Sequence, residues 1–489
     1  MKRYIISFAV LTLFLVSCTD LTDELYDRIP NDKYPENAGQ AALITVPVYS
    51  SMQGLIDGGG WWFLQEIPSD EMVAPTRLTD WDDGGKWRAL HTHTWTNTTE
   101  AVASLWFPMY SGIGQANKLI EANQPFAGQP AADLTIAKVK TMRAFYYYIL
   151  IDNYGDVPFE TNYANAVKTP TKTSKAVIFN AIVKDVEDAI VVLKTNPGNS
   201  KISVNLGMAY TLLTKLYLNA EVYTGTAQWV KAEAAAKAVI DLGTYSLETE
   251  ALKPFITENQ FSPENIFQIP FDEDSYTGFN LHMRTLHYLN NQTFGMTAGP
   301  WNGFAASEDH FNTFDAADAR KKGFLVGQQY DLAGKKLVEG GKNVILDPHI
   351  PALLMDGTFT PEQIRFSGAR VAKFEIKKAA KENLSNDFPL FRYADVLLMK
   401  AEAAIRQGKN GDAEINQVRA RAGVPNFTNT TLDQLLAERG REMFWEGHRR
   451  QDLIRFGKFN AAWWEKPASS PDRNTFPIPQ WVKDTNPNL

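Results

Sequence analysis

The chain of 489 residues contains one cysteine, Cys18. A lone thiol can form neither an intrachain disulfide, nor a CxxC redox pair, nor a zinc site built from several thiolates. A body of this length must therefore be held together by packing alone. Because 44% of the residues are hydrophobic, the chain has enough apolar surface to bury a large core.

Cys18 ends a short apolar segment at the N-terminus. Two basic residues precede an apolar run from Tyr4 to Val16, which is the pattern of a secretory signal peptide and is too short to span a bilayer. The ending Leu-x-Ser-Cys resembles the lipobox of bacterial lipoproteins. That resemblance implies removal of residues 1–17 and lipidation of Cys18, while an ordinary signal peptide that happens to contain a cysteine is the alternative.

The rest of the chain carries no apolar stretch long enough to cross a membrane. Residues 18–37 are polar and interrupted by prolines, so we expect a lipidated tether between the membrane and the folded body. The net charge of −7 argues against nucleic acid as a partner.

Apolar residues recur at three- and four-residue spacing over two long regions, about 101–245 and 390–460. The spacing predicts helices over about 38–57, 133–154, 174–194, 203–222, 228–242, 390–407, 411–422 and 431–457, the last one opening with a capping box at Thr431. Glycine, proline and asparagine interrupt 58–100 and 254–385. We therefore expect one mainly α domain over 38–489, with a tetratricopeptide-like helix-pair scaffold, long loop-rich insertions and little β structure.

Five segments, taken together, resemble the SusD/RagB family of outer-membrane lipoproteins from glycan- and peptide-uptake systems. The strongest is 437–459, Ala-Glu-Arg-Gly-Arg-Glu-Met-Phe-Trp-Glu-Gly-His-Arg-Arg-Gln-Asp-Leu-Ile-Arg-Phe-Gly-Lys-Phe, and the others are 143–159, 392–402, 416–423 and 476–479. They occur in the order of the family and, together with the lipobox, span nearly the whole chain. The resemblance implies a cell-surface protein that captures oligosaccharides and passes them to a SusC-like TonB-dependent transporter. It also implies that the ligand-binding aromatic residues come from N-terminal and mid-chain loops.

The C-terminal segment is rich in arginine and glutamate. Glu446 and Arg450 are spaced i,i+4, and Glu438 and Arg441 are spaced i,i+3, as in ion pairs on a helix. We expect these residues to form a charge network that locks scaffold elements together. A catalytic acid pair is the alternative, but paired carboxylates act in catalysis only where a cleft separates their pKa values.

The irregular segments carry the candidate ligand-binding residues. A planar indole ring matches the C–H face of a pyranose, and neighbouring carboxylates, amides and imidazoles can bind its hydroxyl groups. For any one tryptophan, a structural role in the scaffold is the alternative. The predicted binding residues are Trp81, Asp82, Asp83, Trp87, His91, Trp95, Tyr288, Trp301, Asn302 and Phe304.

Two other functions stay open at this stage. A peptide or another nutrient could be the cargo, although these loops contain no evident basic cluster for a charged terminus. A glycoside hydrolase would need two carboxylates flanking the scissile bond, and Asp82 and Asp83 are merely adjacent. The sequence has no catalytic motif, so we expect no enzymatic activity. We also expect no cofactor, the alternative being a calcium ion held by Asp272, Glu273 and Asp274.

Overall fold

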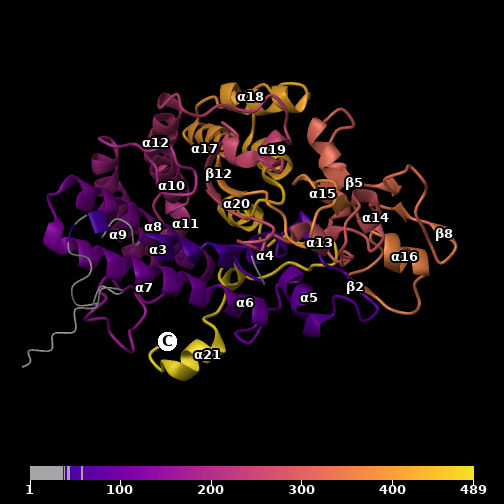
Figure 1. The fold of residues 1–489 in the computed structure, drawn as a ribbon, viewed down its shortest axis with the longest axis horizontal. Coiled ribbons are helices and arrows are strands. Elements are labelled where there is room, and N and C mark those ends of the chain that lie inside the picture. Colours follow the sequence, from indigo (N-terminus) through magenta and orange to yellow (C-terminus); the bar gives the residue numbers. More distant parts are fainter. Residues whose placement is uncertain (1–36, 38, 41–44, 57–58) are drawn as a thin grey trace, which may run out of the picture.

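The computed structural model describes residues 37, 39–40, 45–56 and 59–489. Helices occupy one half of the molecule and a loop-rich part occupies the other, with the C-terminal helices between them (Figure 1). The predicted signal peptide, Cys18 and nearly all of the predicted tether lie outside the described residues.

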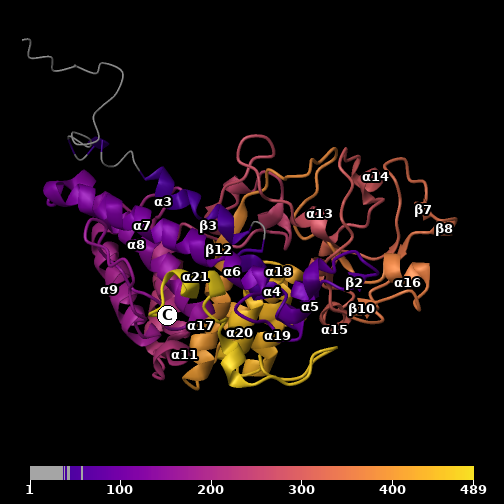
Figure 2. The ribbon, with the colours of Figure 1, turned by 90° about the horizontal axis from the view of Figure 1, so that it is seen from below.

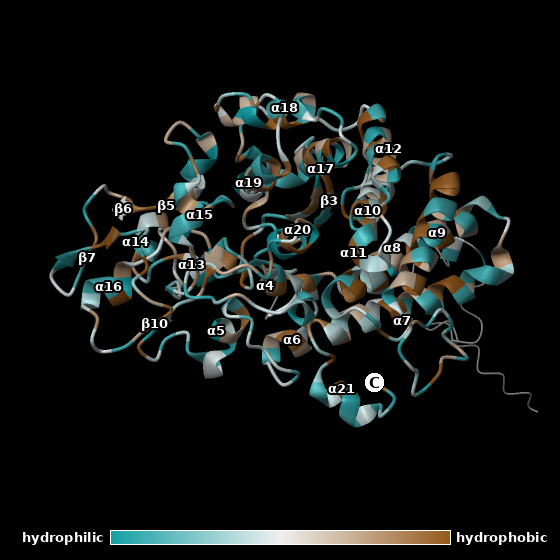
Figure 3. Ribbon diagram, turned by 180° about the vertical axis from the view of Figure 1, so that it is seen from behind, coloured by the Kyte–Doolittle hydropathy of each residue, from teal (hydrophilic) through white to brown (hydrophobic). Residues whose placement is uncertain are grey.

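In the helical half, helices that are close in sequence pack on one another. α7 packs on α8, α8 on α9, and α10 on α12. α12 then packs on α17, so the scaffold continues across the loop-rich insertion. Figure 3 shows these helices striped brown and teal, as expected for helices with one buried face. Their bounds are α7 (Trp106–Asn123), α8 (Pro130–Tyr154), α9 (Lys175–Leu193), α10 (Leu206–Leu218), α11 (Ala220–Thr224), α12 (Trp229–Asp241) and α17 (Tyr393–Arg406).

The C-terminal helices are α18 (Asp412–Ala422), α19 (Leu432–Met443), α20 (Arg449–Arg455) and α21 (Gln480–Thr485). The capping box at Thr431 is present, with Gln434 as its reciprocal partner. The single helix predicted over 431–457 is wrong, because the chain breaks between α19 and α20. Trp445 and Gly447 take φ angles of 67° and 78° there, which a continuous helix does not allow.

The N-terminal elements are short. They are α3 (Val46–Ser50), η1 (Gln53–Leu55), α4 (Trp61–Glu66), η2 (Asp83–Gly85), α5 (Lys86–His91) and α6 (Glu100–Ser104). The helix predicted over 38–57 is therefore not continuous, since among the described residues of that range a turn at Ser51 and Met52 separates α3 from η1.

The loop-rich half carries short helices, namely α13 (Leu281–Thr285), α14 (Asn290–Phe294), α15 (Glu308–Asn312) and α16 (Pro361–Phe366). Over the described ranges, strands form only two-stranded pairs. Five pairs are antiparallel: β1 (Met72–Val73) with β4 (Ala305–Ala306), β3 (Asn265–Ile269) with β12 (Phe388–Arg392), β5 (Phe324–Leu325) with β11 (Arg370–Val371), β6 (Gly327–Gln328) with β9 (Ile345–Leu346), and β7 (Val338–Glu339) with β8 (Lys342–Asn343). β2 (Thr76–Arg77) pairs in parallel with β10 (Leu354–Met355).

One apolar core runs through both halves. It contains Phe145 of the helical half, Trp62 on α4 and Phe304 of the loop-rich half. The predicted mainly α fold with a helix-pair scaffold is confirmed, and its loop-rich insertion packs onto the scaffold. No helix in the described part of the chain is long and apolar enough to cross a membrane.

Candidate functional site

An open hollow of about 380 Å³ lies between α5 and the loop that follows α14. We call it the tryptophan cleft, and its lining is Trp81, Asp83, Lys86, Trp87, Arg284 and Trp301. Four of these six residues were predicted from the sequence. Trp81 and Trp301 are partly exposed, so their rings can meet a ligand.

Trp81 is held in a conformation that few residues adopt. Its φ angle of 60° lies in the left-handed region, which a bulky side chain enters only when its surroundings enforce it. The indole Nε1–H donates a hydrogen bond to the main-chain oxygen of Trp301 at 2.7 Å. The two ring-bearing segments are thereby fixed to each other, although they are far apart in sequence.

The floor of the cleft is aromatic and tightly packed. The Phe304 ring lies 4.9 Å from that of Trp81 and 5.3 Å from that of Trp87. Gly303 lies directly against Trp81, since a Cβ atom there would stand 2.1 Å from Cε2 of the indole. Only glycine lets the indole settle this closely onto the backbone.

The loop that carries Trp301 is anchored to α13. The main-chain N–H groups of Trp301 and Gly303 donate to the oxygens of Met283 at 2.6 Å and Arg284 at 2.8 Å. Asn302, at φ 54°, accepts a hydrogen bond from Arg370 at 2.7 Å. The tryptophan cleft is therefore preformed and rigid, which reduces the entropy lost when a ligand binds.

Cationic groups border the aromatic rings. The Arg284 guanidinium stands 5.3 Å from the centre of the Trp301 ring, and the Lys86 ammonium 4.8 Å from that of Trp87. Asp83 accepts the indole N–H of Trp87 at 2.6 Å. Sequence reasoning missed Lys86 and Arg284, since a single basic residue leaves no pattern, although Lys86 adjoins Trp87.

Trp87 lines the hollow but is buried, at 3% exposed, and four further predicted binding residues are buried and do not line it. Asn302 and Phe304 have no exposed surface and support the cleft from below. His91 and Trp95 are 1% and 2% exposed and lie elsewhere. The expectation that these four side chains face the ligand is therefore corrected.

The chain that follows α20, with Trp464 and Phe476, covers His91 and Trp95. The His91 Nε2 lies 2.9 Å from the main-chain oxygen of Trp464, and the Trp95 ring is 4.7 Å from that of Phe476. Burial lowers the pKa of His91 to about 4, so its ring is neutral near pH 7. Both residues hold the C-terminal segment in place.

The last two predicted residues lie beside the cleft. Asp82 forms an ion pair with Arg88 at 2.7 Å. Tyr288 is partly exposed, and its hydroxyl donates to the carboxylate of Asp80. Neither residue lines the hollow; Asp82 lies between two residues that do, and the partner of Tyr288, Asp80, precedes Trp81.

The glutamates of the C-terminal segment take part in buried ion pairs. Glu438 pairs with Arg441 at 2.7 Å, as predicted. The predicted pair of Glu446 with Arg450 is absent, because the break after α19 turns Glu446 toward Arg392, at 2.7 Å, and leaves Arg450 with Asp152. These ion pairs give residues 437–459 a structural role.

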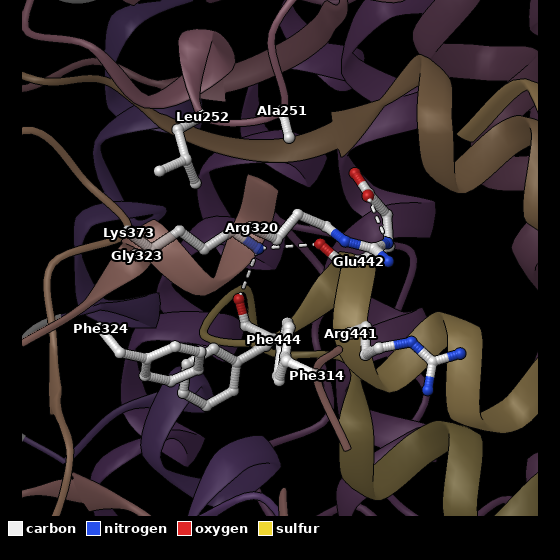
Figure 4. A pocket seen from close by; sticks show the side chains of 10 residues that line it. All are labelled: Ala251, Leu252, Phe314, Arg320, Gly323, Phe324, Lys373, Arg441, Glu442 and Phe444. Carbon is white, nitrogen blue, oxygen red and sulfur yellow. Dashed lines mark hydrogen bonds and ion pairs between the residues drawn. The ribbon is translucent and has the colours of Figure 1, made fainter. Parts of the chain in front are cut away.

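An enclosed void of about 10 Å³ beside this network holds no more than one water molecule (Figure 4). The Lys373 ammonium at its wall donates to the main-chain oxygens of Glu442 at 2.9 Å and Phe444 at 2.6 Å. It also pairs with Glu446 at 2.6 Å. This void is part of the packing and takes no substrate.

The predicted calcium alternative involves carboxylates that already have partners. Glu273 and Asp274 pair with Lys377 at 2.8 Å and Lys381 at 2.7 Å. Asp272 accepts main-chain N–H groups from its own turn. In the described ranges no three His, Cys, Asp or Glu side chains are grouped to hold a metal ion. Calcium binding stays an untested prediction.

Comparison with known proteins identifies the family. A model described as the SusD family matches residues 362–489, and one described as starch-binding, associating with the outer membrane, matches residues 86–206. The starch-binding protein SusD of Bacteroides thetaiotaomicron is 24% identical over 474 residues, which is 86% of this chain and 82% of that protein. The chain belongs to the SusD/RagB family.

Solved SusD-like structures share the fold. A surface glycan-binding protein A from Bacteroides thetaiotaomicron, in complex with laminarihexaose, has a TM-score of 0.74 at 20% identity over 91% of this chain and 98% of that chain. NanU of B. fragilis has a TM-score of 0.75 at 20% identity over 95% and 98%. Trp81, Tyr288 and Trp301 fall outside both matched SusD model ranges.

Proposed function

We propose that this protein binds oligosaccharides at the tryptophan cleft without cleaving them. The observation that carries the proposal is the pair of partly exposed indoles, Trp81 and Trp301, fixed to each other by a 2.7 Å hydrogen bond. Flat rings beside a carboxylate and two cations suit a sugar ring, which presents an apolar face and a rim of hydroxyl groups.

The names of the relatives support a glycan as the ligand, since they include a starch-binding protein and a glycan-binding protein in complex with laminarihexaose. The identity of the glycan is a separate matter. Trp81 and Trp301 lie outside the ranges matched by the family models, whereas Trp87 lies within one of them. We therefore propose that the loops that carry Trp81 and Trp301 set the cargo.

We further propose that Cys18 carries the lipid anchor, that the body lies at the cell surface, and that the bound glycan passes to a SusC-like TonB-dependent transporter. A detergent extract of cells that express the tagged full chain tests the partner. Co-purification of a transporter barrel is expected for the wild-type chain. Its absence would remove the transport part of the proposal.

A glycan panel tests the binding. Purified protein is run through native gels that contain starch, laminarin or another polysaccharide, and the reducing ends are measured after incubation. We expect retardation without new reducing ends. The dissociation constant should lie in the range of about 1 μM to 1 mM, or roughly 4–8 kcal/mol, because flat stacking buries little area. Release of reducing ends would overturn the binding-only function.

A further inference from the structure

A second hollow, of about 700 Å³, lies at the loop-rich end between the β7–β8 hairpin and the start of α16. We call it the hairpin hollow. Glu339 and Lys342 line it from the hairpin, and Glu362 and Arg365 line it from the helix. Nothing in the sequence singled it out. Figures 1 and 2 both show α16 close to β2, the strand that precedes Trp81.

An unbroken series of contacts joins the hairpin hollow to the tryptophan cleft. The Arg365 guanidinium stands 4.3 Å over the ring of Tyr288. The hydroxyl of Tyr288 donates to Asp80, the residue before Trp81. Asp80 is exposed, and Tyr288 and Arg365 are partly exposed, so the strip formed by these three residues lies on the surface. These three residues offer a ligand longer than the cleft a surface that leads from one hollow to the other.

The strip is rigid at its centre. Arg365 makes two parallel hydrogen bonds to Glu339, at 2.8 Å from Nε and 2.5 Å from Nη2. The Arg365 hydrogen bonds lower the pKa of Glu339 to about 2, so this carboxylate remains ionised at neutral pH. A capping box at Thr360 fixes the start of α16. The hollow therefore exists before any ligand arrives, as a site that orients a sugar requires.

The chemistry of the hairpin hollow suits hydroxyl groups. Lys342 and Glu362 form an exposed ion pair of 3.1 Å at its rim, with side chains 69% and 39% exposed. Such a pair is worth little to the fold, so it can exchange its partner for a sugar hydroxyl at small cost. Both signs of charge are present, and no tryptophan lines the hollow. The Phe366 ring in its lining is only 6% exposed, so the hollow orients a sugar mainly by hydrogen bonds.

We propose that the hairpin hollow is a further subsite for the same oligosaccharide, with Tyr288 and Arg365 under the stretch between the two hollows. This inference rests on the proposed function of the tryptophan cleft. It makes the protein a binder of chains rather than of single sugars or disaccharides, because only a chain reaches both hollows. The second subsite adds affinity for long ligands, as the two contacts act on one molecule.

The test is calorimetry with disaccharides and hexasaccharides of the malto and laminari series, using the purified full chain. The readout is the ratio of hexasaccharide to disaccharide affinity. The double variant Lys342→Met/Glu362→Gln removes the charges of the hairpin hollow. The matched control is Lys184→Met/Asp188→Asn, an exposed ion pair of 2.8 Å on α9.

We expect the wild-type ratio to be at least about tenfold and the double variant to lower it about fivefold, the effect of losing about one hydrogen bond of ordinary strength. The control should leave the ratio unchanged. A wild-type ratio near one, or an unchanged ratio in the folded double variant, would overturn the second subsite and leave the cleft intact. Failure of the wild type to bind any member of either series or any polysaccharide of the panel would instead overturn the proposed function, and this inference with it.

Discussion

At the scale of single residues, the tryptophan cleft depends on how closely Trp81 approaches the backbone of Gly303. The two positions belong to different segments, and their contact leaves no room for even a methyl group. A glycine is needed here because of this approach rather than because of a positive φ angle. The geometry of the cleft can therefore be tested without removing a ring.

We predict that Gly303→Ala weakens glycan binding at least about tenfold, because the added Cβ displaces the Trp81 indole. Overpacking should also lower the free energy of unfolding by about 1–3 kcal/mol. Calorimetry and denaturant unfolding measure the two effects. The matched control is Gly299→Ala, where a Cβ meets no heavy atom within 4 Å. Equal binding by both variants would contradict the packing argument.

A buried carboxyl group predicts how stability depends on pH. Glu66 on α4 has no exposed surface and accepts the main-chain N–H of Gly447 at 2.5 Å. Burial raises its pKa to about 8. Between pH 4.5 and 8 the folded state therefore keeps a proton that the unfolded state releases. This contribution to stability is complete below the unfolded pKa and is lost as the pH rises through the folded pKa.

The variant Glu66→Gln stays neutral at every pH. We predict that its free energy of unfolding, relative to that of the wild type, increases by at least about 2 kcal/mol from pH 5 to pH 8. Urea unfolding at the two pH values measures the gap. Asp188→Asn on the surface of α9 serves as the control. A gap that does not widen with pH would show that Glu66 is ionised in the folded protein.

Single residues also show what the sequence can and cannot predict about the site. Trp81, Trp87 and Trp301 meet as expected, since ring-rich irregular segments favour a shared surface. His91 and Trp95 belong to the same pattern, yet the C-terminal segment covers them. A contact between positions so far apart leaves no local signal in one sequence.

At the scale of elements, the break between α19 and α20 decides which charges meet. The apolar period continues through it, so the sequence predicts one helix. The φ angle of Trp445 and the approach of Gly447 to Trp61, where a Cβ would stand 2.5 Å from the ring, are tertiary effects. The break turns Glu446 toward Arg392 at the end of β12.

Arg392 is the centre of this network. It pairs with Glu442 at 3.0 Å, with Glu446 at 2.7 Å and with Glu264, and all four side chains are buried. We predict that Arg392→Met lowers the free energy of unfolding by about 3–5 kcal/mol, because it takes one counterion away from each of three buried carboxylates.

The control for Arg392→Met is Lys237→Met, which removes an exposed i,i+4 ion pair on α12. Its cost should stay below about 0.5 kcal/mol. Urea unfolding of both variants gives the comparison. Similar losses in the two variants would contradict the view that the C-terminal segment locks the scaffold.

At the scale of the whole molecule, the two halves differ in how far a sequence reveals them. The helical half follows from a 3.6-residue period, which depends only on neighbours along the chain. The loop-rich half is built from pairs of distant short strands, such as β2 with β10 and β1 with β4. Strands of two residues carry no period of their own, so the hairpin hollow and the packing that holds the predicted cleft rings together appear only in the structure.

The same division describes how the molecule is organised for binding. α7, α8, α9 and α17–α20 fall within the ranges matched by the SusD family models, while α12 and the residues Trp81, Tyr288 and Trp301 fall outside them. We therefore expect relatives with this scaffold to differ in cargo through these loops.

The most direct test of the account is the affinity of Trp81→Ala and Trp301→Ala for the oligosaccharide that the glycan panel identifies. Trp481→Ala is the control, since this ring on α21 is 44% exposed and does not line the cleft. Calorimetry on folded variants should show each cleft variant at least about tenfold weaker than the wild type, and the control unchanged. Undiminished binding by both cleft variants would contradict the central claim that these two indoles receive the sugar.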